Sequence, residues 1–176
     1  MTCVSVIRDN KHHIDLAINS YKQQTYENKE LLLITNFQLN QAIEESNIKT
    51  LYAPRYSVGE AKNLALEKSS GQIIINWQQG GLSSPERISS QLLAMAHSDA
   101  DIVLLSEIGL RYQDADYTVS CPSLAMVETI AYIRHPDLLY PKTNLGTDLY
   151  LLELAYSKGL SAISIPGKEL YSQHPN

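Results

Sequence analysis

Cysteine is scarce in this sequence, and long apolar segments are missing. The 176 residues include only two cysteines, Cys3 and Cys121, which excludes a disulfide framework and a four-cysteine zinc site. The longest apolar runs, such as residues 31–34, are far shorter than the ~20 residues that cross a bilayer. The N-terminal apolar stretch is short and is followed at once by charged and polar residues, unlike a secretory signal. We therefore expect no transmembrane segment and a cytoplasmic location.

Basic residues are also too few for a nucleic-acid-binding surface. The chain has 14 Lys and Arg against 19 Asp and Glu, a formal net charge of -5, and no basic run that would neutralise phosphates along a duplex. Nucleic acid is excluded as a partner on this ground. No internal repeat, low-complexity tract or linker rich in Pro or Gly interrupts the chain, so we expect one domain over residues 1–176.

Apolar strands and amphipathic helices alternate through the first two thirds of the chain. The period-2 and apolar runs predict strands at Thr2–Ile7, Leu31–Ile34, Ile48–Ala53, Ile73–Trp77 and Ile102–Leu105. Helical spacing predicts helices from His12, around Gln41–Glu45, after the Ser57/Glu60 capping box as far as Gly71, and over Ser83–Ala96. Such alternation is typical of an α/β fold with a mostly parallel central sheet and helices on both faces.

The period is less regular after residue 105. Short strands are predicted at Tyr117–Cys121, Glu128–Ile133, Ile163–Pro166 and Glu169–Tyr171. A helix is predicted over Leu149–Lys158, ended by Gly159.

Open α/β sheets bind ligands outside the carboxyl ends of their strands. In this sequence those ends are followed by the segments Arg8–Asn10, Thr35–Phe37 and Gln78–Gly81. Gly80 and Gly81 either let a phosphate approach the backbone or form a plain turn. These three loops are the predicted functional edge.

Five segments also match, in order, the motifs of one enzyme family. They are residues 2–34, GEAKN at 59–63, SGQIIINW at 70–77, SPERISSQL at 84–92, and YPKTNLGTDLYLLELAYSKG at 140–159. Together they resemble the family 2 glycosyltransferases over nearly the whole chain. The resemblance implies a nucleotide-diphospho-sugar transferase fold, also called GT-A-like.

That resemblance implies a reaction as well as a fold. Family members move a sugar from a nucleotide-sugar donor to an acceptor hydroxyl, with Mn²⁺ or Mg²⁺ held by an Asp-x-Asp loop and a separate acid taking the acceptor proton. The positions that match the donor site are Arg8, Asp9, Thr35, Asn36, Lys62, Asn63, Trp77, Gln78 and Gln79.

Most acidic positions of the family pattern are occupied by other residues here. Thr35 and Asn36 stand where paired Asp are usual, and Gln78 and Gln79 stand where the metal loop has carboxylates. Amides form hydrogen bonds but carry no charge to hold a hard cation. The metal loop is therefore interpreted as degenerate, and no metal ligand is assigned.

Asp148 is the acid that remains from the Gly-Glu-Asp motif. It is the general base, the N-cap of the helix predicted to begin near Leu149, or both, since the two roles are compatible. Gln78 and Gln79 either bind sugar hydroxyls or belong to a polar loop, and Lys62 and Asn63 either face the donor or face water.

Two hypotheses for the function follow. In the first, the chain is a sugar transferase in which Asp148 is the base and Gln78 and Gln79 replace the metal loop. In the second, it is a non-catalytic homologue that binds a glycan, a nucleotide or a protein partner, including a second copy of itself.

Overall fold

The central sheet follows from the apolar strands found in the sequence. The computed structural model describes residues 1–8, 12–39, 43, 45–112, 115–120 and 126–173. Within them, seven strands form one sheet in the order β10-β6-β9-β4-β1-β2-β3. The strands are β1 (Thr2–Ile7), β2 (Glu30–Thr35), β3 (Ile48–Tyr52), β4 (Ile73–Asn76), β6 (Ile102–Leu105), β9 (Met126–Ile133) and β10 (Ala162–Ile165).

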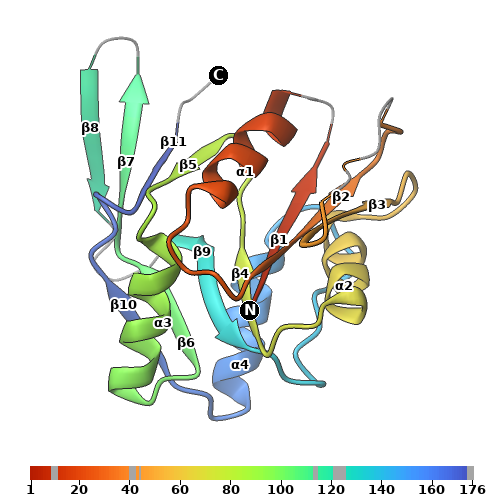
Figure 1. The fold of residues 1–176 in the computed structure, drawn as a ribbon. Coiled ribbons are helices and arrows are strands. Elements are labelled where there is room, and N and C mark those ends of the chain that lie inside the picture. Colours follow the sequence, from red (N-terminus) through yellow and green to blue (C-terminus); the bar gives the residue numbers. More distant parts are fainter. Residues whose placement is uncertain (9–11, 40–42, 44, 113–114, 121–125, 174–176) are drawn as a thin grey trace.

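The sheet is mostly parallel, as the alternation predicts. β1 runs parallel to β2 and to β4, and the pairs β2–β3 and β6–β10 are also parallel. Only β9 runs against its neighbours β4 and β6. The carboxyl ends of β1, β2 and β4 therefore reach the same edge of the sheet (Figure 1).

Helices cover both faces of this sheet. The helices are α1 (His12–Lys22), α2 (Val58–Lys68), α3 (Arg87–Ser98) and α4 (Thr147–Ser157). Alternate side chains of β1 point to opposite faces, so Val4 joins a core that includes residues of α2 and α4, whereas Cys3 joins one that includes residues of α1 and α3. The α/β class with helices on both faces is thus confirmed.

A smaller sheet differs from the sequence prediction. It has the order β5-β11-β7-β8, with β5 (Gly81–Ser83), β7 (Glu107–Tyr112), β8 (Ala115–Ser120) and β11 (Tyr171–Gln173). Because Ser83 pairs with Tyr171 in this sheet, α3 begins at Arg87, and the predicted start at Ser83 was wrong. Strands β5 and β7 were not predicted, and the last strand lies two residues later than expected.

Two helix boundaries also differ from the prediction. α2 ends at Lys68, three residues before Gly71, because Ser69 already has an extended backbone. The helix predicted around 41–45 falls largely outside the described residues, and Glu45 forms an isolated bridge with Ile48. The capping box of Ser57 and Glu60 is present as predicted, with both reciprocal hydrogen bonds. Over the described residues, no helix has the length and apolarity required to cross a membrane.

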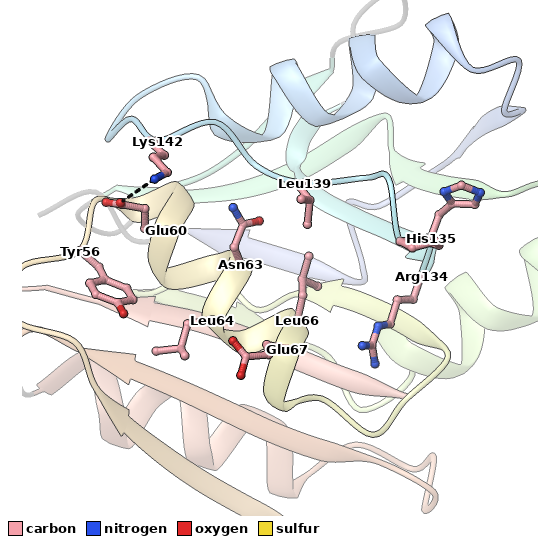
Figure 2. Close-up of a pocket in the computed structure, with 11 residues that line it drawn as sticks. Tyr56, Glu60, Asn63, Leu64, Leu66, Glu67, Arg134, His135, Leu139 and Lys142 are labelled. Carbon is pink, nitrogen blue, oxygen red and sulfur yellow. Dashed lines mark ion pairs between the residues drawn. The ribbon is translucent and has the colours of Figure 1, made fainter.

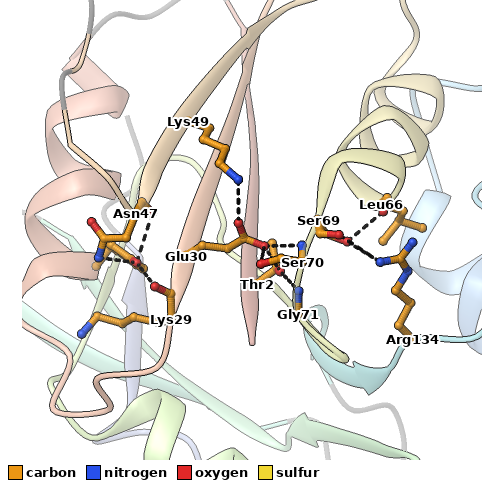
Figure 3. A network of polar contacts seen from close by, with 11 residues as sticks. Thr2, Lys29, Glu30, Asn47, Lys49, Leu66, Ser69, Ser70, Gly71 and Arg134 are labelled. Atoms are coloured by element: carbon orange, nitrogen blue, oxygen red, sulfur yellow. Dashed lines mark hydrogen bonds and ion pairs between the residues drawn. The ribbon is translucent and has the colours of Figure 1, made fainter.

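The buried carboxylate of Glu30 links chain segments at the opposite edge of the sheet, where the amino ends of the strands lie (Figure 3). Glu30 accepts hydrogen bonds from the Thr2 hydroxyl at 2.6 Å and from the backbone and hydroxyl of Ser70 at 2.6 and 2.8 Å. Lys49 lies 3.3 Å away. Burial alone would raise the pKa of Glu30, but these donors outweigh it and lower the pKa from 4.5 to about 2.

This shift predicts acid-sensitive stability. Because the folded pKa is lower than the unfolded one, Glu30 stabilises the fold fully above pH 4.5 and loses that contribution as the pH falls towards 2. Glu30→Gln is expected to lower the free energy of unfolding by about 3 kcal/mol at pH 7 and by much less near pH 2. Urea unfolding at both pH values measures this difference.

Glu67→Gln is the matched control, because the Glu67 side chain is 68% exposed and forms a surface ion pair with Lys68. That change should stay within about 0.5 kcal/mol at both pH values. An equal loss for Glu30→Gln at pH 7 and pH 2 would contradict the assignment.

Candidate functional site

A polar cavity opens at the carboxyl ends of β1 and β4. Its volume is about 230 Å³. It is lined by Val4, Val6, Arg8, Val58, Lys62, Asn76, Trp77, Gln78, Gln79, Asn144, Gly146, Thr147 and Asp148. The structure therefore brings six of the ten sequence-predicted site residues to one place, from four separate parts of the chain. We call it the strand-end pocket.

A buried ion pair forms one wall of the strand-end pocket. Lys62 Nζ lies 2.5 Å from Asp148 Oδ1, and the two side chains are only 9% and 14% exposed. Lys62 also lies 3.4 Å from the Thr147 hydroxyl and over the ring of Tyr140. Burial lowers the pKa of Lys62, while the Asp148 carboxylate opposes that change. Of the two alternatives for Lys62, the one in which it simply faces water was wrong.

Asp148 is also held from the sheet side. Asn76, the last residue of β4, donates from its amide to Asp148 Oδ1 at 2.6 Å. Asn76 in turn accepts from the Tyr140 hydroxyl at 3.3 Å, and Tyr132 donates to Tyr140 at 3.3 Å. Both phenols are neutral at pH 7, and burial raises their pKa further above the ordinary value. A chain of neutral groups thus supports the carboxylate.

The alternative assignment of Asp148 as a helix N-cap was wrong. α4 begins at Thr147 with Gly146 as its N-cap, in a left-handed conformation (φ +67°) and with no side-chain capping bond. Asp148 lies inside the first turn, and its side chain accepts hydrogen bonds from Lys62 and Asn76. The first backbone N–H groups of α4 therefore lie at the pocket without a side-chain cap, which favours negative charge there.

Two of the loops at the predicted functional edge, those that contain Arg8 and Gln79, are joined by a hydrogen bond at the mouth of the pocket. The Arg8 backbone N–H donates to the Gln79 side-chain oxygen at 3.1 Å, and the Arg8 guanidinium donates to the Tyr56 carbonyl. Gly80 has φ +74° in the turn that follows, so the chain does turn at this residue, and the approach of a phosphate to its backbone stays a prediction.

The Gln78–Gly80 loop is anchored at both ends by buried residues. Trp77 is 2% exposed, and its indole donates to the Ala17 carbonyl at 2.9 Å. The fully buried Arg87 guanidinium lies between the rings of Trp77 and Tyr171 and donates to the Asn76 carbonyl and the Ser83 hydroxyl. The loop is thus positioned by the core on either side.

Three predicted site residues that the structure describes do not line the pocket. Thr35 is buried, and its hydroxyl donates to the Phe37 carbonyl; neither Thr35 nor Asn36 lines the cavity. Asp9 lies outside the described residues. Asn63 faces the other way and forms two hydrogen bonds of 2.9 Å with the backbone of Tyr140.

Asn63 instead lines a larger cavity of about 470 Å³ on the outer side of α2 (Figure 2). Its walls are α2 and the segment 134–142, and its floor includes Leu64 and Leu66. Glu60, one of its carboxylates, is occupied by the capping box and by Lys142 at 3.9 Å. This cavity lies away from the strand ends, so volume alone does not identify the site.

The residues of the strand-end pocket do not fit Mn²⁺ or Mg²⁺. Among the described residues, no three His, Cys, Asp or Glu side chains lie close enough together to hold a metal ion. Asp148 is the one carboxylate among the described residues that line the pocket, and Lys62 already neutralises it. Hard divalent cations prefer several charged oxygen ligands, so we derive no step through a metal.

Sequence reasoning missed Asn76, Tyr140 and Arg87. Asn76 ends the apolar run Ile73–Ile75, and a polar residue at the end of a buried strand was a usable signal. Tyr140 and Arg87 gave no comparable local signal, because their partners are distant in the sequence.

Comparison with known proteins supports the fold but not a closer relationship. No protein-family model and no curated protein matches the chain. Among solved structures, S. aureus TarS 1-349 in complex with UDP superposes with a TM-score of 0.77 at 13% identity, over 99% of this chain and 60% of that chain. The mannosyltransferase PcManGT from Pyrobaculum calidifontis, in complex with GDP-Man and Mn²⁺, gives 0.75 at 12%, over 98% and 56%. The TarS complex with UDP-GlcNAc gives 0.76 at 13%, over 100% and 59%.

These matches confirm the GT-A-like glycosyltransferase fold predicted from the sequence. The chain spans about 60% or less of each of these proteins.

The opposite orientations of Asn63 and Gln78 predict opposite effects on stability. Asn63→Ala should lower the free energy of unfolding by about 1–3 kcal/mol, because two hydrogen bonds to the Tyr140 backbone are lost. Gln78→Ala, at the polar mouth of the pocket, should change it by less than about 0.5 kcal/mol. Denaturant unfolding of both variants measures the contrast, and equal losses would contradict the two placements.

Proposed function

We propose that the chain binds the diphosphate of a nucleotide-sugar without a metal ion and transfers the sugar to an acceptor hydroxyl. One observation carries this proposal: within a GT-A-like fold, the described residues that line the strand-end pocket include two cations, Arg8 and Lys62, and one carboxylate, Asp148. Solved structures of similar fold contain UDP, UDP-GlcNAc or GDP-Man.

Charge supports a diphosphate in this pocket. Two cationic side chains and one anionic side chain line it, and the uncapped first turn of α4 adds partial positive charge. At about 230 Å³ the cavity is smaller than typical pockets for whole drug-sized ligands. It therefore suits a small charged group, with the rest of the nucleotide lying outside it.

Asp148 is the proposed general base. In the proposed reaction the acceptor oxygen bonds to the anomeric carbon of the sugar, and its proton passes to the Asp148 carboxylate. The bond from that carbon to the diphosphate oxygen breaks, and the nucleoside diphosphate leaves with the electron pair. Arg8 and Lys62 stabilise the negative charge that develops on the leaving group.

A second candidate function is a non-catalytic nucleotide-binding domain. The observation that favours it is the Lys62–Asp148 ion pair, which occupies the one carboxylate in the pocket lining. The two functions share the binding step and differ only in turnover.

The binding step is tested by calorimetric titration with UDP. UDP should bind weakly, and Mn²⁺ should change the dissociation constant less than twofold, because Gln78 and Gln79 cannot neutralise the cation. Arg8→Gln should weaken binding about tenfold. Lys142→Gln removes a cation that is 83% exposed beside the other cavity and should have no effect. A large gain with Mn²⁺ would overturn the metal-free site.

Turnover is tested by UDP release from UDP-GlcNAc. Asp148→Asn is expected to reduce the rate at least about 100-fold while the protein stays folded, because general-base catalysis contributes on that scale. A full rate in the folded variant excludes Asp148 as the base. UDP binding by a wild-type protein that releases no UDP supports the non-catalytic candidate.

A further inference from the structure

The strand-end pocket contains an ion pair whose two members face a polar cavity rather than the apolar core. Lys62 and Asp148 both line the cavity, yet each is more than four-fifths shielded from water. A buried pair costs desolvation free energy that its mutual attraction only partly offsets. Its position at a cavity wall leaves room for another anion to approach the ammonium.

We propose that Asp148 occupies the place of an anionic ligand in the empty pocket, and that a bound diphosphate takes over the Lys62 ammonium. This inference rests on the proposed function. It identifies Lys62 as the cation that exchanges partners and Asp148 as the group that the exchange releases.

Asp148 has a support that remains when Lys62 leaves. Asn76 donates to the same carboxylate oxygen at 2.6 Å and is itself fixed at the end of β4 by the Tyr140 hydroxyl. Asp148 therefore stays in place after the exchange. Its carboxylate then has one fewer cationic partner and is available to an acceptor hydroxyl.

Lys62 has the mobility that the exchange requires, because its charge lies at the end of a four-carbon side chain. The centroid of the Tyr140 ring lies 4.9 Å from Nζ, and this cation–π contact also attracts the ammonium. Burial lowers the pKa of Lys62, and the charge of Glu128, like that of Asp148, opposes this change. A diphosphate carries more charge than one carboxylate, so it is the stronger partner for this ammonium.

The exchange couples binding to chemistry. The base is occupied while the pocket is empty and is released when the diphosphate arrives. Binding of the diphosphate, which becomes the leaving group, therefore also releases the carboxylate that acts as the base.

The test uses inorganic pyrophosphate as the probe and the whole chain. Removing the competing carboxylate should strengthen anion binding, so Asp148→Asn should bind pyrophosphate at least fivefold more tightly than the wild type. The gain should vanish in the double variant Lys62→Gln/Asp148→Asn, because it depends on the freed ammonium. Glu153→Gln removes an exposed carboxylate from the same helix and should leave the affinity unchanged.

Unchanged or weaker pyrophosphate binding by folded Asp148→Asn would overturn the exchange. A gain that persists without Lys62 would also overturn it, because the effect would then be one of net charge. The wild-type protein gives an independent measurement if Asp148→Asn does not fold. With ε-¹³C-lysine, the Lys62 signal, assigned by its loss in Lys62→Gln, should shift at saturating pyrophosphate, and a constant signal counts against the proposal.

These results separate the exchange from the proposed function. UDP binding to the wild type without a gain in Asp148→Asn overturns the exchange alone. A Lys62-dependent gain for pyrophosphate, in a protein that does not bind UDP, overturns the nucleotide function alone.

Discussion

Burial of the central sheet on both faces is the constraint that determines where polar chemistry can occur. Helices α1 and α3 cover one face and α2 and α4 the other, so interior strand positions are apolar. Buried polar groups need partners, and the ends of the strands provide them. At the amino ends Glu30 collects its donors from Thr2 and Ser70, whereas at the carboxyl ends Asn76 and Asp148 face a cavity.

The two ends illustrate different uses of a buried carboxylate. Glu30 accepts three hydrogen bonds and a lysine contact, which leaves little capacity for a ligand and makes it a structural fastener. Asp148 accepts from one amide and one ammonium, both on the same oxygen. Asp148 therefore has fewer donors than Glu30, and its second carboxylate oxygen can accept a hydrogen bond from a ligand. The number of donors around each acid, rather than burial alone, distinguishes the two roles.

Local sequence patterns were sufficient for the layers of the fold. Periodicity located the seven strands of the central sheet, and the Ser57/Glu60 pattern located the start of α2. The small sheet was predicted only in part, since the expected strands at 117–121 and 169–171 overlap β8 and β11 but β5 and β7 were missed. β5 has three residues, and its pairing depends on Tyr171, which is almost ninety residues away. In the site, the strand-end rule located Arg8, Gln78 and Gln79. It did not orient Asn63, because the direction of a helical side chain depends on where the helix packs.

Arg87 connects the two sheets. Among the described residues, its charged guanidinium donates hydrogen bonds to neutral acceptors. Its guanidinium binds the carbonyl at the end of β4 and the hydroxyl at the end of β5, and it packs on Tyr171 of β11. Gln78 and Gln79 lie between these two attachment points, and their side chains are not needed to join the sheets, because Arg87 already does so. Such a loop tolerates replacement of its side chains while the backbone keeps its course, so ligand chemistry at this edge can diverge between homologues without loss of the fold.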